Sequence, residues 1–463
     1  MPSIRERNGV QKRALEQKPV CSIIFSMKKI LVLTLLAVWL ALFASALAYN
    51  LPQTRLWVEW QVAKVQTTIK YSLNPPEQAV FVPGAAVEDN EPGNQVVAPT
   101  QTLPPTFTPS PVPTEPGPTP TPEPTVTATL QPTPLPVAVT LQGVRYEDQH
   151  GKWSYCAPAN LSMLLSYWGW EGNRDVTGPY LKPYDRDKNV MPYEMLDFVE
   201  TQTGLKAVVR VNGTLELLKT FLSQEFPVLV ERGVYERDFN GVVTWMGHYQ
   251  VLTGYNDQGD YFLAQDSYRT PNLQVPSQDL LNGWRSFNYI YMVAYPPERE
   301  AEVMAILGAD ADEQQNHRAA LERAGQDILT QEGMQLFFAY FNRGSNLVKL
   351  QDYFGAAQAY DQAFTLYADL PEKDRPWRMM WYQTGPYFAY FYSGRYRDVI
   401  GLADKTLEVM SEPILEETYY WRAQAKWALG DANGAIEDFR KSLEYHPGFG
   451  PTLQSAAMLG INL

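Results

Sequence analysis

The apolar residues of the chain follow several distinct patterns, and the first is an almost uninterrupted run from Ile30 to Ala48 that follows two lysines. A run of this length predicts an export signal, either a retained membrane anchor or a signal peptide cut near Ala46 and Ala48. We favour an anchor over residues 27–49 because no charged or helix-breaking residue interrupts the run.

Basic residues before this run place the N-terminus in the cytoplasm by the positive-inside bias, so the rest of the chain would face outward. Residues 1–26 show no pattern of their own and are interpreted as a cytoplasmic tail or a wrongly assigned start. Residues 50–97 begin with helical spacing and are interpreted as a juxtamembrane helix and linker. We expect a single-pass cell-membrane protein with extracytoplasmic domains, or a secreted protein if the signal is cleaved.

Residues 98–136 consist mainly of proline, threonine and other residues that build no core. Such a segment favours extended polyproline conformations, so it could hold the next domain on the order of 100 Å from the bilayer. We interpret it as a disordered stalk whose role is to hold the next domain away from the membrane.

Residues 137–298 mix helical and strand patterns. Helices are predicted over 158–168, 192–203 and 215–224, and strands over 227–233, 248–257, 260–268 and 289–297. A tight turn at Asp257, Gln258 and Gly259 joins the middle two strands. One helix followed by a largely antiparallel sheet makes this region an α+β domain.

Residues 299–463 repeat a simple scheme of helix, short turn with Asp or Gly, and second helix. The small residues Gly344 and Ala356 in the first copy, and Gly430 and Ala435 in the last, resemble those of tetratricopeptide repeats. The resemblance implies an all-α repeat domain whose concave face binds a protein partner or the substrate. Several tyrosines either line that face or pack between helices, and we favour packing: Tyr382, Tyr387, Tyr390, Tyr419 and Tyr420.

Charge and cysteine content narrow the functional classes. The net charge of -13 argues against a nucleic-acid partner, because such surfaces need clustered Lys and Arg. The two cysteines, Cys21 and Cys156, lie on opposite sides of the apolar run, so no disulfide between them is expected if that run crosses a membrane. Cys156 is then a free thiol, kept either as a buried hydrophobe or for its chemistry.

Cys156 directly precedes a predicted helix, where backbone amides and the helix dipole favour a thiolate. A thiolate nucleophile needs a base, and of the four histidines His248 is the best candidate, at the predicted start of a strand. Asp266 stands at the end of the next strand, so an antiparallel hairpin would place it beside His248. Cys156, His248 and Asp266 thus have the chain order of papain-like enzymes.

The stretches WSYCAPANLSMLLSYWGW and GHYQVLTGYNDQGDYFLAQDS resemble the bacteriocin-processing, double-glycine-type cysteine peptidases, specifically their stand-alone secreted relatives. The resemblance covers about a third of the chain. It implies a papain-like fold with Cys156 as nucleophile, His248 as general base and Asp266 as the residue that orients the histidine. It also implies that Gln149 donates a hydrogen bond to the oxyanion.

Two departures from the family pattern concern the oxyanion region. Ala157 stands where the family usually has glycine, which adds a methyl group where the substrate approaches. Gln149 lies seven positions before Cys156, farther than the family's glutamine, and His150 is an alternative oxyanion donor.

We therefore interpret the chain as an exported, membrane-anchored cysteine peptidase that cleaves peptide bonds and carries a protein-binding repeat module. No cofactor and no metal are expected. Two alternatives remain open. One is a surface binding protein whose peptidase-like domain is inactive, and the other is a papain-like acyl transferase related to transglutaminases.

Overall fold

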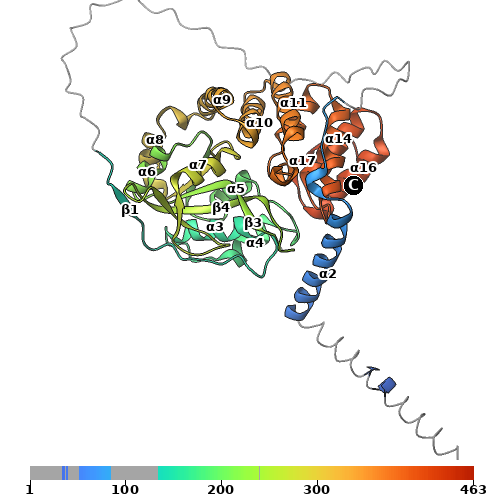
Figure 1. The fold of residues 1–463 in the computed structure, drawn as a ribbon, viewed down its shortest axis with the longest axis horizontal. Helices are drawn as coiled ribbons and strands as arrows, with labels where there is room; N and C mark the ends of the chain where they lie inside the picture. The colour runs from blue at the N-terminus through green and yellow to red at the C-terminus, as the bar shows by residue number, and fades with distance from the viewer. Residues whose placement is uncertain (1–33, 37, 40–51, 85–133, 239) are drawn as a thin grey trace, which may run out of the picture. The chain divides into compact units, whose positions relative to one another are not determined.

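The computed structural model describes residues 34–36, 38–39, 52–84, 134–238 and 240–463 (Figure 1). The chain divides into two compact units, residues 1–69 and 70–463. Most of the apolar run expected to act as an export signal lies outside the described residues. Among the helices that are described, none is both long enough and apolar enough to cross a membrane.

The second unit contains an α+β domain built on a seven-stranded sheet in which every pairing is antiparallel. Its order is β2-β7-β3-β4-β5-β6, and β1 pairs with β4. The strands are β1 (Ala138–Thr140), β2 (Lys206–Arg210), β3 (Val228–Arg237), β4 (Val243–Asn256), β5 (Tyr261–Gln265), β6 (Leu273–Pro276) and β7 (Tyr291–Tyr295). The helices are α3 (Cys156–Ser166), α4 (Arg174–Leu181), α5 (Pro192–Gln202), α6 (Leu215–Ser223) and α7 (Ser277–Arg285).

Adjacent residues of the central strands enter different apolar clusters, because successive side chains of a strand point to opposite faces. Leu229 and Val251 pack in the cluster that contains residues of α3 and α5. Their neighbours Val230 and Leu252 pack in the cluster that contains residues of α6 and α7. Both faces of the sheet are therefore covered by helices, which explains why the strands read as continuous apolar runs.

The helical module follows the α+β domain and contains three consecutive helix pairs. The pairs are α10 (Gly333–Lys349) with α11 (Tyr353–Asp369), α13 (Gly385–Tyr392) with α14 (Tyr396–Val409), and α15 (Glu416–Ala428) with α16 (Ala432–Tyr445). Helices α8 (Glu300–Leu307) and α9 (Glu313–Thr330) precede them, α12 (Met379–Tyr382) lies between the first two pairs, and α17 (Gly450–Met458) follows the last.

Small residues set the spacing of these pairs. A side chain at Gly344 of α10 would come within 2.7 Å of the Tyr360 ring of α11, so only glycine permits this approach. Tyr360, Tyr387 and Tyr390 are fully buried. The interpretation of Tyr387 and Tyr390 as packing residues is confirmed.

The segment after α2 (Pro52–Leu73) differs from the linker that the sequence predicts. Phe81 is buried in the apolar core of the helical module, with ring contacts to Phe364 at 5.1 Å and Tyr390 at 6.0 Å. The backbone N–H of Gly84 donates to Asp398 Oδ1 at 2.7 Å. Residues 76–84 are therefore part of the helical module, because the short apolar stretch around Phe81, with Val80, packs on a core that lies far along the chain.

The Pro/Thr-rich stalk expected over residues 98–136 lies outside the described residues except for 134–136, so it stays a prediction. Residues 70–84 before it and residues from 134 onward after it belong to the same compact unit.

Replacing Phe81 with alanine is expected to destabilise the helical module by about 3 kcal/mol, because a buried aromatic side chain leaves a cavity. Urea unfolding of the full chain measures this loss. The matched control is Val82→Ala, whose side chain is 58% exposed and which should change the free energy of unfolding by less than about 0.5 kcal/mol. Equal stability of the two variants would show that residues 76–84 do not dock in solution.

Candidate functional site

Cys156 is the first residue of α3, directly after a loop that turns sharply. Gly151 and Ser154 of this loop both have positive φ, at 84° and 48°. Pro158 lies in the first turn, where a missing N–H costs nothing because the amides there have no carbonyl partner in the helix. Those amides and the helix dipole favour negative charge at Cys156, whose thiol is free and half-buried.

His248 lies inside β4, and its prediction at the start of a strand is wrong. The strand begins at Val243, and His248 pairs with Arg232 of β3 in the middle of the sheet. Thr244 and Gly247 interrupt the apolar pattern ahead of the histidine, which hid the first part of the strand. The His248 side chain is buried.

Asp266 follows the last residue of β5 and contacts the histidine directly. In the β4–β5 hairpin Val251 pairs with Gln265, so the next residue along the chain falls beside the part of β4 that carries His248. The His248 Nε2 atom lies 3.0 Å from Asp266 Oδ1. The hairpin argument made from the sequence is confirmed for this pair.

Three further N–H groups donate to the Asp266 carboxylate. The backbone amides of Tyr268 and Arg269 reach Oδ1 at 2.8 and 2.9 Å, and the Gln250 Nε2 atom reaches Oδ2 at 2.6 Å. Burial raises the pKa of Asp266, but the charge and hydrogen bond of His248, with the other donors, hold it well below its usual range. Asp266 is therefore an anion that fixes the histidine ring.

Cys156 and His248 influence each other's protonation. Burial raises the pKa of the thiol, but the hydrogen bond and charge of His248, the Tyr249 amide and the charge of Lys182 lower it below its ordinary value. Burial lowers the pKa of His248, while Asp266 and Cys156 raise it to about 10. Since Nε2 faces Asp266, Nδ1 is the ring nitrogen left for Cys156. Both shifts favour a thiolate beside an imidazolium over a neutral pair.

Gln149 is held next to this group by a short chain of hydrogen bonds. The Asn160 Nδ2 atom donates to Ser267 Oγ at 2.8 Å and to the Cys156 carbonyl at 2.9 Å. Ser267 Oγ in turn donates to Gln149 Oε1 at 2.7 Å. The amide oxygen of Gln149 is thereby engaged, which leaves its Nε2 group to act as a donor.

The structure shows where His150 and Ala157, the other two residues of the oxyanion region discussed in the sequence, are placed. The His150 Nδ1 atom lies 2.7 Å from Asp148 Oδ1 on the surface, so this ring is engaged outside the group described above. Ala157 is buried in the apolar cluster beneath α3, where its methyl group packs with the core.

Lys182 supports the loop before Cys156 and was missed in the sequence. Its buried ammonium donates to the carbonyls of Trp153 and Ser154. Burial lowers the pKa of Lys182 to about 8, although Asp187 and Cys156 oppose this shift. No periodic pattern marks Lys182, because its role depends on a loop that turns back on it.

Glu231 and Tyr382 also lie near Cys156. Glu231 is buried in β3 opposite Tyr249, and burial raises its pKa well above the ordinary value. The sequence already shows Glu231 as an acidic residue inside the apolar run PVLVERG, and this pattern could have indicated a buried carboxyl group. The pKa of Tyr382 is raised by burial, lowered by Arg378 and raised by the nearby Cys156 thiolate.

Tyr382 reaches this position because the helical module packs on β4. Its ring contacts Trp245 and Phe287 of the α+β domain, with centroids 6.1 and 5.8 Å away. The Arg378 guanidinium donates to the Trp245 carbonyl at 3.1 Å and pairs with Asp238 at 3.3 Å. The strand that carries His248 is therefore braced by the helical module.

Known families match the two regions described above. A family model described as the Peptidase_C39 like family matches residues 141–292, which include Cys156, His248, Asp266 and Gln149. The chain carries a peptidase C39-like domain. A second model, described as tetratricopeptide repeat, matches residues 416–448, which cover α15 and α16. Both resemblances stated from the sequence are confirmed.

A search of solved structures found a match to part of the chain. A crystal structure described as a C39-like peptidase from Bacillus anthracis is 16% identical, with a TM-score of 0.28. The match covers 34% of this chain and 96% of that chain. No curated protein matches the chain.

Proposed function

We propose that the peptidase C39-like domain is a cysteine peptidase that hydrolyses peptide bonds, with Cys156 as nucleophile, His248 as general base and Asp266 as its positioning partner. The observation that carries the proposal is the 3.0 Å contact between His248 Nε2 and Asp266, made beside a thiol whose pKa is lowered by His248. An activated thiol, a histidine and an orienting carboxylate are what nucleophilic acyl transfer requires.

In this reaction the Cys156 sulfur attacks the peptide carbonyl carbon, and a tetrahedral oxyanion forms. The Cys156 backbone amide and the Gln149 Nε2 group are the donors proposed for that oxyanion. The His248 imidazolium gives its proton to the leaving amine as the C–N bond breaks, which leaves a thioester. Neutral His248 then takes a proton from water, whose oxygen attacks the thioester and releases the acid and the thiol.

We further propose that the apolar run at residues 27–49 anchors the protein in the cell membrane, with the two folded parts outside. The helical module would bind a protein partner or the substrate, as tetratricopeptide repeats are typical protein-binding modules. Fractionation of cells that produce the full chain tests the anchor. Recovery in the membrane fraction and release only by detergent are expected, whereas recovery in the soluble cytoplasm would contradict it.

Alkylation of Cys156 as a function of pH tests the activated thiol. In the full chain with Cys21→Ser, we expect fast alkylation to persist well below pH 8, because the hydrogen bond and charge of His248 lower the pKa of the thiol. His248→Ala removes the hydrogen bond and the charge that oppose burial, so the pKa of the thiol rises. The alkylation rate at pH 6 should then fall by at least about 10-fold.

The control for this measurement is His150→Ala, which removes an exposed ring that is bonded to Asp148. It should leave the alkylation rate unchanged. An ordinary thiol titration that is indifferent to His248 would contradict the peptidase proposal and favour a binding protein. Products in which an added amine replaces water would favour the acyl transferase.

A further inference from the structure

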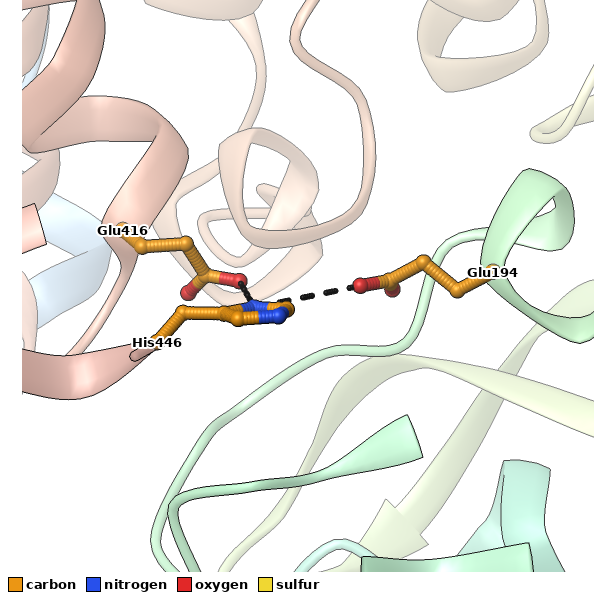
Figure 2. A group of neighbouring side chains, drawn as sticks. All are labelled: Glu194, Glu416 and His446. Atoms are coloured by element: carbon orange, nitrogen blue, oxygen red, sulfur yellow. Dashed lines mark hydrogen bonds and ion pairs between the residues drawn. The ribbon is translucent and has the colours of Figure 1, made fainter. Parts of the chain in front are cut away.

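A second group of ionisable side chains lies where α5 of the peptidase C39-like domain meets the last helix pair. Figure 2 shows the His446 ring between two carboxylates, Glu416 from the first turn of α15 and Glu194 from α5. The His446 Nδ1 atom lies 2.9 Å from Glu416 Oε1 and 4.0 Å from Glu194 Oε1. One ligand atom from each residue falls within 4.8 Å of the other two.

The neighbourhood of these residues contains more buried negative charge than its ion pairs neutralise. Glu416, Glu417 and Asp187 are 2%, 6% and 2% exposed. Within the described residues, Glu417 has no salt bridge, and Glu194 and Glu416 share only His446. The charges of Lys182 and Lys188 act on Asp187, so the uncompensated charge is that of the three glutamates. Burying a carboxylate without a counterion is costly, so a proton or a cation must be bound here.

Unpartnered oxygen atoms mark where a cation would sit. The Glu416 Oε2 and Glu417 Oε2 atoms are buried and have no hydrogen-bond partner. Glu194 uses its Oε2 atom to accept from the Met191 amide at 2.7 Å, which leaves Oε1 turned toward His446. Glu417 is close enough for its charge to affect Glu194. The unpartnered oxygens therefore belong to the same group of side chains. They are a second sign that a cation binds there.

We propose that Glu194, Glu416 and His446 bind a divalent transition-metal cation, Zn²⁺ or Mn²⁺. An imidazole nitrogen with carboxylate oxygens suits these ions, whereas Ca²⁺ and Mg²⁺ prefer oxygen ligands alone. The buried Glu417 carboxylate supplies further negative charge. The site is independent of the peptidase chemistry proposed above.

Such a cation links two parts of the fold that are far apart in sequence. Glu194 belongs to the peptidase C39-like domain, while Glu416 and His446 belong to the last helix pair. Direct ion pairs of Arg186 and Lys188 with Glu412 join the same two parts nearby. Metal binding would therefore stabilise the docking of the helical module, because the cation binds only when both parts are in place.

Metal titration of the full chain tests the proposal. The parent carries Cys21→Ser and Cys156→Ala, so that no thiol can bind the added metal. After treatment with EDTA, isothermal titration with ZnCl₂ and MnCl₂ should show one site per chain, and either metal should raise the Tm. CaCl₂ should bind at least about 10-fold more weakly.

Glu416→Gln gives the decisive comparison, since the amide keeps the shape and can still accept from His446. Affinity for Zn²⁺ should fall by about 100-fold or more, and the metal-dependent rise in Tm should vanish. In EDTA this variant should be at least as stable as the parent, because a buried charge is gone. A general folding defect would instead lower the Tm in EDTA.

Glu444→Gln is the matched control, an exposed acid two residues before His446 that pairs with Lys441. It should bind Zn²⁺ like the parent. The proposal is overturned if the parent has the same Tm in EDTA and in metal and binds no stoichiometric Zn²⁺ or Mn²⁺. It is also overturned if Zn²⁺ affinity survives Glu416→Gln, or if Ca²⁺ binds as tightly as Zn²⁺.

Discussion

Replacing Asp266 with asparagine is expected to lower the rate of peptide hydrolysis near pH 7 by about 10³-fold. The carboxylate accepts from His248 and two backbone amides through Oδ1 and from Gln250 through Oδ2. Asparagine has only one acceptor oxygen, so its amide N–H₂ must face another donor. Either the histidine loses its partner or Gln250 is repelled.

The pH dependence should change in a defined direction. Asp266 is the main favourable influence that raises the pKa of His248 to about 10 against burial. Without that negative charge the pKa of His248 falls, and the imidazolium that holds the thiolate is lost at lower pH. The alkaline limb of the pH profile should therefore move to lower pH in Asp266→Asn.

Steady-state peptide hydrolysis across pH 5 to 10 measures both effects. Asp260→Asn is the control, because it removes an exposed carboxylate from the same hairpin at a residue with positive φ that asparagine tolerates. It should retain full activity. An Asp266→Asn enzyme with the parental rate and profile would show that the carboxylate does not position the histidine.

The sequence predicted the central part of the fold because its signals are local. A free cysteine before a helix, a histidine in one strand and an aspartate after the next depend only on helix and hairpin geometry. The apolar runs of β3, β4 and β7 were strong because both faces of the sheet are covered. Short elements such as β6 and α4 were missed because so few residues give little periodicity.

Contacts between distant segments could not be predicted in this way. Phe81 lies in a stretch without a repeating pattern, and its core partner Phe364 lies more than 250 residues away. Glu194 and His446 are similarly remote, so each resembles an ordinary surface residue in the sequence. No metal was expected from the sequence, and a site built from residues this far apart produces no local motif that would indicate one.

The role of Gln149 was suggested by the family resemblance. The contacts that hold Gln149 in place join distant segments and could not be predicted from the sequence. The sequence placed it too far from Cys156 for a simple fit. Ser267, directly after Asp266, closes that gap by donating to the Gln149 side chain, and its carbonyl accepts from the Gln149 backbone amide at 2.8 Å. The loop between Gln149 and Cys156 can therefore be long while the glutamine stays in place.

Gln149→Ala is expected to lower kcat for peptide hydrolysis by about 10² to 10³-fold, with little change in KM. A donor to the oxyanion acts mainly in the transition state, where the negative charge develops. Ser267→Ala should have a smaller effect in the same direction, because it releases the Gln149 amide without removing it.

Alkylation of Cys156 by a neutral reagent separates this role from thiol activation, since that reaction forms no oxyanion. Both variants should alkylate at the parental rate while hydrolysis falls. Gln149→Glu keeps the size of the side chain but removes the donor, and it should be as impaired as Gln149→Ala. Retained hydrolysis in Gln149→Glu would show that another group stabilises the oxyanion, whereas slower alkylation would assign Gln149 to the thiolate itself.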